Sequence, residues 1–208
     1  GVQTCALPIS HECGHAILDG LRPQWLSSTA APQTGALHEA FGDITAIFLT
    51  LSQFDQVEAI VAQTKSNLHD KTFLSDMAEE FGLALGRANG LRNADNDLKL
   101  SQVGTEVHSL SQVFTGAIYD VLADIFASER TSVRDDALTL YDRAAYLLSL
   151  ILRGIMQAPV TNATFTDVAN KMLAVTAADA TAGIITSAQA TSYRNFIRNR
   201  FSVREIVL

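Results

Sequence analysis

The segment VHSLSQVFTGAIYDVLADIFASE, at residues 107–129, carries the clearest structural signal in the chain. Its apolar residues recur at i, i+3, i+4 and i+7, the pattern of an amphipathic helix with one buried face. They are Leu110, Val113, Phe114, Ala117, Ile118, Val121, Leu122 and Ile125. We therefore predict a long helix that packs against the core of the protein.

Helical patterns also occur on both sides of this segment. The first, at about 10–19, is stopped by Gly20 and Pro23. A polar loop is predicted at 89–106. The remaining predicted helices lie at about 36–53, 56–66, 71–88, 135–157, 165–178 and 187–201. No segment alternates well enough to predict a strand, so the predicted fold class is all-α.

Length, composition and charge limit the classes of function. The chain has 208 residues, of which 48% are apolar, enough for the core of one domain or of one large half of a two-domain protein. The net charge of -7 disfavours nucleic acid and anionic lipid as partners. No uninterrupted apolar run reaches the roughly 20 residues of a membrane helix, so we predict no membrane insertion. The two cysteines, Cys5 and Cys13, provide no disulfide framework.

The first nine residues, GVQTCALPI, have neither the pattern of a signal peptide nor the periodicity of a helix or strand. They resemble the conceptual translation of a short sequencing adaptor. We interpret residues 1–9 as an assembly artefact and residues 10–208 as one helical domain, a fragment of a longer protein. The alternative interpretation is a genuine flexible tail.

The motif HECGH at residues 11–15 has the spacing of a metal site. On a helix, residues four apart project from one face, so His11 and His15 can reach a single cation. Glu12 lies beside them, toward the open coordination position. Zinc accepts nitrogen and carboxylate ligands in a tetrahedron and keeps a fourth place for water. Two histidines alone are insufficient, and a third protein ligand is needed.

Downstream, GALHEAFGDITAIF at residues 35–48 offers Glu39 and Asp43, again four apart on one helical face. With this second segment the chain resembles the thermolysin-like, or gluzincin, metallopeptidases. The resemblance implies that Glu39 is the third zinc ligand and that Asp43 accepts a hydrogen bond from the free ring nitrogen of His11. Asp19, four residues after His15, matches the extended family motif and is a further candidate for the second coordination shell.

Two later segments strengthen the resemblance. GLRNADND, at residues 90–97, looks like the family's Leu-Arg segment and suggests Arg92 as the substrate-binding arginine. EVHSLSQVFTGAIYDVL, at residues 106–122, resembles the stretch that begins with a second catalytic histidine, which points to His108. The implied fold is the helical C-terminal domain of such an enzyme. The strand-rich N-terminal lobe that forms the other wall of the cleft is expected to be missing from this chain.

The resemblance implies a zinc-dependent endopeptidase that acts on a peptide or protein substrate. Zinc would lower the pKa of a bound water, and Glu12 would take the proton and deliver it to the leaving amine. His108 would stabilise the oxyanion, and Arg92 would position the substrate. The fragment itself is expected to be weakly active or inactive. The resemblance also suggests secretion of the full-length protein.

The sequence departs from the family pattern around the second histidine. The region between His15 and Glu39 contains no tyrosine to assist in oxyanion stabilisation. The aspartate expected shortly before the second histidine is replaced by Val103, which leaves Glu106, Asp97 or Asp95 as substitutes. The alternative function is therefore a degenerate, non-catalytic peptidase-like helical domain that binds zinc or a protein partner.

Two further departures concern the segments around the metal motif. Thr50 stands where a carboxylate for structural calcium would be expected, so the sequence does not support calcium binding. His38 precedes Glu39 where many relatives carry Asn. We interpret His38 and His69 as surface or packing residues.

Overall fold

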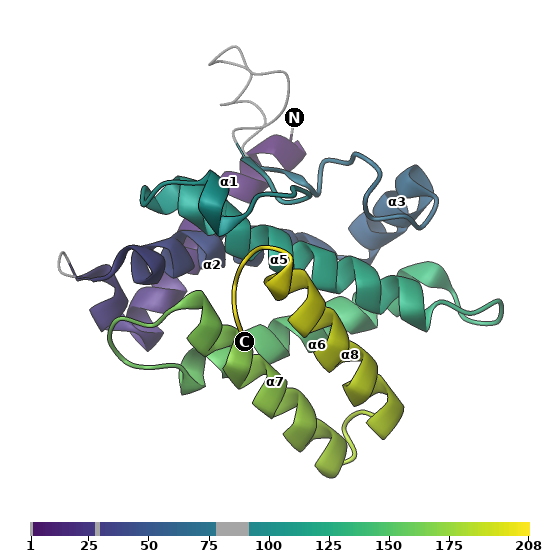
Figure 1. Ribbon diagram of the computed structural model, residues 1–208. Helices are drawn as coiled ribbons and strands as arrows, with labels where there is room; N and C mark the ends of the chain where they lie inside the picture. The colour runs from purple at the N-terminus through teal and green to yellow at the C-terminus, as the bar shows by residue number, and fades with distance from the viewer. Residues whose placement is uncertain (1, 28–29, 78–91) are drawn as a thin grey trace.

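The computed structural model describes residues 2–27, 30–77 and 92–208, and its architecture is all-α, as predicted (Figure 1). The helices are α1 (Val2–Leu21), α2 (Pro32–Leu51), α3 (Phe54–Thr64), α5 (Val107–Glu129), α6 (Asp136–Gln157), α7 (Phe165–Thr181) and α8 (Ser187–Ser202). Short 3₁₀ turns lie at Pro23–Leu26 (η1) and Leu100–Gln102 (η2).

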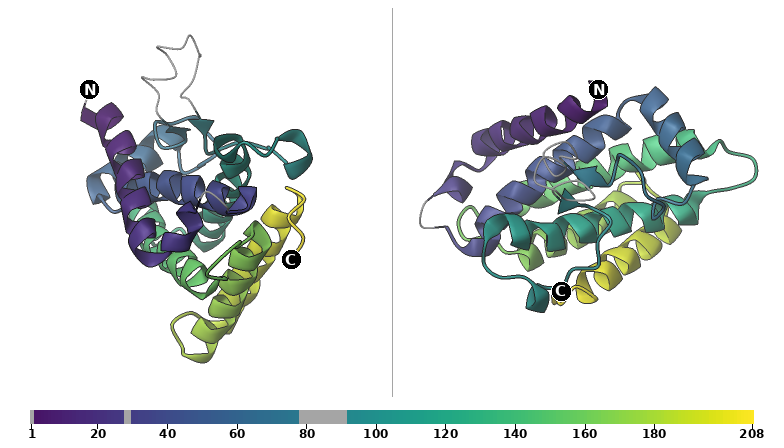
Figure 2. Two further views of the ribbon diagram at one scale, coloured as in Figure 1. Left: turned by 90° about the vertical axis from the view of Figure 1, so that its left-hand side faces the viewer. Right: turned by 90° about the horizontal axis from the view of Figure 1, so that it is seen from above.

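The amphipathic segment at 107–129 forms α5, which runs through the middle of the molecule (Figures 1 and 2). It packs against α2 on one side and α8 on the other, and α1 lies on the outer face of α2. The hairpin of α7 and α8 lies on the side opposite α1. The ring of Phe114 on α5 lies 5.2 Å from that of Phe165 and 5.4 Å from that of Phe201, measured between centroids, and all three are buried. The core is therefore built around α2 and α5.

Capping residues explain why the later helices begin where the sequence predicted. Asp135 caps α6 by accepting a hydrogen bond from the backbone N–H of Leu138. Thr164 and Thr186 each form a capping box at the start of α7 and α8. Proline stands at the start of α2, where its missing N–H costs nothing, so this helix begins at Pro32 rather than at the predicted Ala36.

The first helix is longer than predicted. It begins at Val2 and contains Pro8, so the prediction that residues 1–9 lack helical structure is wrong for residues 2–9. The prediction required an apolar periodicity, but a helix that packs farther along the chain can extend beyond its packed part without one. Pro8 and Ile9 are both exposed.

The prediction that the chain contains no strand is also wrong. β1 (Asp76–Met77) and β2 (Arg92–Asn93) pair in antiparallel fashion, with Asp76 opposite Asn93 and Met77 opposite Arg92. Two residues are too few to produce the alternation that identifies a strand in a sequence. The predicted helix at 71–88 does not begin at Lys71, because residues 71–77 form turns and β1, and its remainder at 78–88 lies outside the described residues.

The end of α1 is anchored to the end of α6, which helps to position the metal motif. The Arg22 guanidinium donates hydrogen bonds to the carbonyls of Ile155, at 3.0 Å, and of Met156. A cation at a helix C-terminus satisfies carbonyls that have no partner within the helix. Trp25 is buried beside it, and its Nε1 donates to the carbonyl of Pro159 at 3.2 Å.

By length and composition alone, one described helix could cross a membrane. This is α5, and 83% of its most apolar window is buried inside the protein, as in the core helix of a soluble protein. The pair α2 and α3 passes the same test only if counted as one span, although the two helices are bent by 94°. The sequence prediction considered only uninterrupted apolar runs and therefore passed over α5.

Candidate metal centre

Two glycines bring α1 and α2 into close contact at the metal motif. A Cβ on Gly14 would lie 2.9 Å from the Cα of Gly42, and a Cβ on Gly42 would lie 2.7 Å from ring atoms of His11. Distances under 3.0 Å leave no room for a side chain. Glycine at both positions therefore lets the imidazole of His11 lie directly against the backbone of α2.

The structure brings the three predicted ligands together between these helices. The Nε2 atoms of His11 and His15 are 2.9 Å apart. The Glu39 carboxylate lies opposite both, with Oε2 3.6 Å from His11 Nε2 and Oε1 3.7 Å from His15 Nε2. One ligand atom from each residue thus lies within 4.8 Å of the other two.

This donor set fits zinc. Zinc–nitrogen bonds of about 2.0 to 2.1 Å place tetrahedral ligand atoms about 3.3 Å apart, and the three observed separations lie on either side of that value. When both Nδ1 atoms carry the ring protons, two nitrogen lone pairs and a carboxylate face one another. A cation between them would relieve that repulsion.

Asp43 lies behind His11, where the resemblance implied it. Its Oδ1 is 2.9 Å from His11 Nδ1, and the carboxylate is buried. A carboxylate is an acceptor, so this contact favours a proton on Nδ1 and leaves the lone pair of His11 on Nε2, toward the cluster. A metal-binding histidine needs this tautomer here.

Asp19 contacts His38, and His38 in turn contacts His15. Asp19 Oδ1 lies 3.0 Å from His38 Nε2, and His38 Nδ1 lies 2.7 Å from His15 Nδ1. His38 is only 2% exposed. The surface interpretation of His38 is therefore wrong, whereas the packing interpretation holds, and the ring in addition contacts His15 and Asp19 beside the candidate metal cluster of His11, His15 and Glu39. Its position directly before Glu39 places it near the ligands, but its contact with His15 depends on how α1 packs against α2.

His108 lies at the edge of the cluster, at the start of α5. Its Nε2 is 3.4 Å from Glu39 Oε2, and its Nδ1 is 2.6 Å from Glu106 Oε1. Of the three carboxylates considered from the sequence, Glu106 is thus the one that contacts His108, while Asp95 contacts His69 instead. The two ring nitrogens of His108 therefore lie between two carboxylates.

Glu106 also caps α5, which explains its position. Its carboxylate accepts hydrogen bonds from the backbone N–H groups of His108 and Ser109. Burial alone would raise the pKa of Glu106, but these hydrogen bonds and the one from the His108 ring together outweigh burial and lower the pKa to about 2. Glu106 is therefore a carboxylate throughout the neutral range.

Glu12 and Arg92 are less closely tied to the cluster. Glu12 is exposed on α1, one residue after His11, and its charge acts on His15 in the direction that raises the pKa of that ring. The backbone of Arg92 lies in β2, and its side chain lies outside the described part of the chain. The role that the resemblance implied for Arg92 stays a prediction.

The electrostatics of the cluster favour the metal-binding protonation states. Burial is the largest cause that lowers the pKa of His15, and the neighbouring His11 lowers it further. For Glu39, burial would raise the pKa, but the nearby imidazoles of His11, His108 and His15 lower it. Metal binding requires neutral imidazoles and an ionised carboxylate, and both shifts act in that direction.

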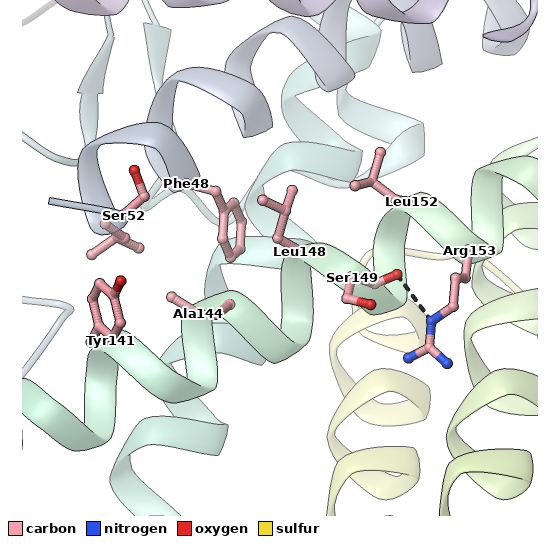
Figure 3. Close-up of a pocket in the computed structure, with 10 residues that line it drawn as sticks. Phe48, Ser52, Tyr141, Ala144, Leu148, Ser149, Leu152 and Arg153 are labelled. Carbon is pink, nitrogen blue, oxygen red and sulfur yellow. Dashed lines mark hydrogen bonds between the residues drawn. The ribbon is translucent and has the colours of Figure 1, made fainter. Parts of the chain in front are cut away.

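Two other features of the described structure lie apart from these residues. One is an apolar pocket of about 410 Å³ between α2 and α6 (Figure 3). Its charged residue, Arg153, is paired with Asp179 at 2.6 Å. The pocket shares no residue with the metal cluster, and most of the side chains that line it are apolar.

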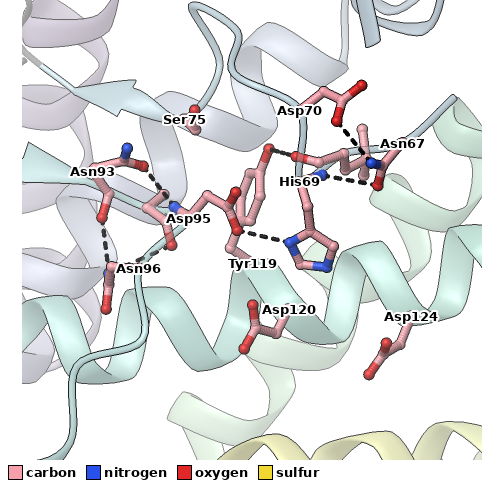
Figure 4. Close-up of polar contacts among 12 residues, drawn as sticks. Asn67, His69, Asp70, Ser75, Asn93, Asp95, Asn96, Tyr119, Asp120 and Asp124 are labelled. Carbon is pink, nitrogen blue, oxygen red and sulfur yellow. Dashed lines mark hydrogen bonds and ion pairs between the residues drawn. The ribbon is translucent and has the colours of Figure 1, made fainter. Parts of the chain in front are cut away.

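The other feature is a second histidine–carboxylate cluster of His69, Asp95 and Asp120 (Figure 4). His69 Nδ1 lies 2.8 Å from Asp95 Oδ1. Asp120 is already paired with Arg204 at 2.9 Å and lies 3.7 Å from Arg200. Because two guanidinium groups already neutralise this region, it is a network of charges that ties loops to α5.

Comparisons with family models, with curated proteins and with solved structures find no match for this chain. The convergence of His11, His15 and Glu39 is therefore the feature of this chain that points most directly to a function.

Proposed function

We propose that this chain carries the metal centre of a zinc-dependent metalloendopeptidase of the thermolysin-like, or gluzincin, type. The single observation that supports the proposal best is the convergence of His11, His15 and Glu39 on one point between α1 and α2. The carboxylate of Asp43 behind His11 adds the orienting contact that such sites use.

In this proposal, His11, His15 and Glu39 hold zinc, which when bound supplies a Lewis acid that polarises a carbonyl and acidifies water. Glu12, exposed beside the cluster, acts as general base and then as general acid toward the leaving amine. Its exposure allows a substrate to reach it.

His108 would act as the donor to the developing oxyanion. The Glu106 carboxylate accepts a hydrogen bond from Nδ1, which fixes the orientation of the ring, and in this role the ring is the doubly protonated imidazolium. Nε2 then carries a proton on the side of the metal cluster, near Glu39. A donor aimed at an oxyanion typically contributes roughly 3 to 4 kcal/mol to transition-state stabilisation. Glu106 takes the place that the absent aspartate leaves open.

Replacement of Glu12 by Gln in the full-length protein, which includes the N-terminal lobe that this chain is expected to lack, tests the proposal directly. The variant should bind one zinc ion per chain, as the wild type does, because Glu12 is not a ligand. Its peptide cleavage should fall by about 10²- to 10⁴-fold, the usual contribution of a general base. Zinc content by mass spectrometry and cleavage of a quenched fluorescent peptide library provide the two measurements. Undiminished cleavage by the variant would exclude Glu12 as the base and contradict the proposed mechanism.

A second candidate is the non-catalytic zinc-binding domain. It is favoured by the absence of tyrosine from residues 16–38, which removes one expected oxyanion donor. The same experiment separates the two. Stoichiometric zinc without cleavage by either protein supports the non-catalytic domain.

A further inference from the structure

The two histidines of the metal cluster are held by different partners. His11 contacts a buried carboxylate, that of Asp43, directly. His15 instead contacts a second imidazole, that of His38, which is buried and comes from α2. The rings of His15 and His38 lie nearly parallel, at 19°, with their centroids 4.8 Å apart. The far nitrogen of His38 contacts the part-buried Asp19 on α1.

When His15 and His38 are both neutral, one placement of their ring protons satisfies the contacts that run from His15 through His38 to Asp19. A carboxylate only accepts hydrogen bonds, so His38 must donate to Asp19 from Nε2. A neutral His38 then has its lone pair on Nδ1. That lone pair accepts a hydrogen bond from His15 Nδ1–H across 2.7 Å. His15 consequently keeps its own lone pair on Nε2, which faces His11 and Glu39.

We propose that His38 is a positioning residue of the metal centre, which holds His15 in its metal-binding tautomer and is itself oriented by Asp19. The proposal rests on the proposed zinc site. It assigns Asp19 an indirect role: the carboxylate acts on His15 through a second imidazole. The positions on the two helices favour this arrangement, because His38 directly precedes Glu39 on α2 and Asp19 lies one turn beyond His15 on α1.

Two substitutions of His38 separate its two contacts. In His38→Asn, the amide oxygen occupies the δ position and can accept from His15, but the side chain is too short for Asp19. In His38→Gln, the amide nitrogen occupies the ε position and can donate to Asp19, but the acceptor for His15 is lost. Loss of an orienting partner typically weakens metal binding by about 10- to 100-fold. We expect that loss for His38→Gln and a loss under about tenfold for His38→Asn.

A matched control comes from the second histidine–aspartate pair. His69 contacts Asp95 at 2.8 Å, a distance similar to that between His38 and Asp19, but lies in the separate cluster. His69→Gln should leave zinc affinity unchanged. Zinc affinity is measured by competition with a chromophoric chelator, and the cobalt(II) absorption spectrum of each protein reports the geometry of the site. The spectrum should change in His38→Gln and stay close to that of the wild type in His38→Asn.

A measurement on the metal-free wild-type protein makes the test independent of zinc and of variant folding. Long-range proton–nitrogen NMR correlations identify the tautomer of each imidazole. The proposal requires the proton on Nδ1 in His15 and on Nε2 in His38. A proton on Nδ1 of His38 would overturn it, as would zinc affinities for His38→Gln equal to wild type. A wild-type protein with the required tautomers that fails to bind zinc would contradict the proposed function and leave the positioning role of His38 in place.

Discussion

The metal cluster and the cluster around His69 contain the same kinds of side chain, yet their surroundings differ. At the first, the contacts join histidines to carboxylates: His11 with Asp43, His15 and His108 with Glu39. At the second, the contacts include guanidinium groups: Arg204 pairs with Asp120 at 2.9 Å, and Arg200 lies 3.7 Å from the same carboxylate. A group of histidine and carboxylate side chains can take up a metal cation only where no protein cation already neutralises the carboxylates.

The largest expected effects follow from removal of one carboxylate from each cluster, Glu39 from the first and Asp120 from the second. Glu39→Ala removes a proposed zinc ligand and should weaken zinc binding by more than about 100-fold. Loss of a residue that only orients a ligand costs about 10- to 100-fold. Calorimetric titration with zinc measures the change. Glu58→Ala, an exposed site on α3, is the control and should bind as the wild type does. Zinc affinity within tenfold of wild type in Glu39→Ala would mean that Glu39 is not a ligand.

In the second cluster the corresponding substitution should affect stability instead. Asp120→Ala leaves the Arg204 guanidinium, which is 2% exposed, without its carboxylate. Breaking a buried ion pair from one side costs about 3 to 5 kcal/mol, and the remaining contacts of Arg204 with Asn96 and Leu98 should keep the loss near the lower value. Urea unfolding measures the free energy. Zinc affinity of the folded protein should not change.

Asp124→Ala provides the control for that experiment. Its partner Arg200 is about one-third exposed, with 33% of its side chain accessible, so the guanidinium can be solvated when the carboxylate is removed. We expect a loss of about 1 kcal/mol or less, as for surface pairs. Equal losses in Asp120→Ala and Asp124→Ala would contradict the interpretation that burial makes the Asp120 pair important.

A smaller effect should follow from a change in the space between α1 and α2. Gly42→Ala places a Cβ against the His11 ring, so the ring or the helix must move. Overpacking of this kind costs about 1 to 3 kcal/mol, and displacement of His11 should also weaken zinc binding. The control is Gly20→Ala on α1, where no atom lies within 4 Å of the added Cβ, so the change should be neutral or slightly stabilising. Wild-type zinc affinity in Gly42→Ala would show that the close approach is not required for the site.

These local differences explain how far the sequence could predict the site. The i, i+4 spacing of His11 with His15 and of Glu39 with Asp43 follows from helix geometry alone, and the structure does bring the three predicted ligands together. The role of His38 could not be predicted in this way, because it depends on how α1 crosses α2. That crossing is set by packing at Gly14, not by the pattern of either helix.

The same distinction applies to the fold. The long helix at 107–129 was predictable because its apolar residues repeat over several turns. The pairing of β1 with β2 was not, since each strand has only two residues. The partner of His108 was partly predictable from the sequence. Glu106 stands at the N-cap of α5, and attention to capping would have favoured it over Asp95 and Asp97.

The smallest expected effect concerns the opposite pKa shifts of the two clusters. Burial lowers the pKa of His15, whereas the hydrogen bond with Asp95 raises the pKa of His69. The charges of Asp95 and Asp120 also raise the pKa of His69. Burial and the charge of Arg200 act in the opposite direction. A raised pKa in the folded state means that the stabilisation is fully present below the unfolded pKa of about 6.5 and is lost as the pH rises through the folded pKa.

Because 42% of the His69 side chain is exposed, the contribution should be under about 1 kcal/mol, as for surface pairs. We therefore expect the unfolding free energy of the wild type, measured without metal, to fall slightly more than that of His69→Gln as the pH rises from 6 to 8. NMR titration of the His69 ring checks the direction of the shift independently. A His69 pKa below 6.5 would show that burial and Arg200 outweigh Asp95, and the second cluster would then resemble His15 in its electrostatics.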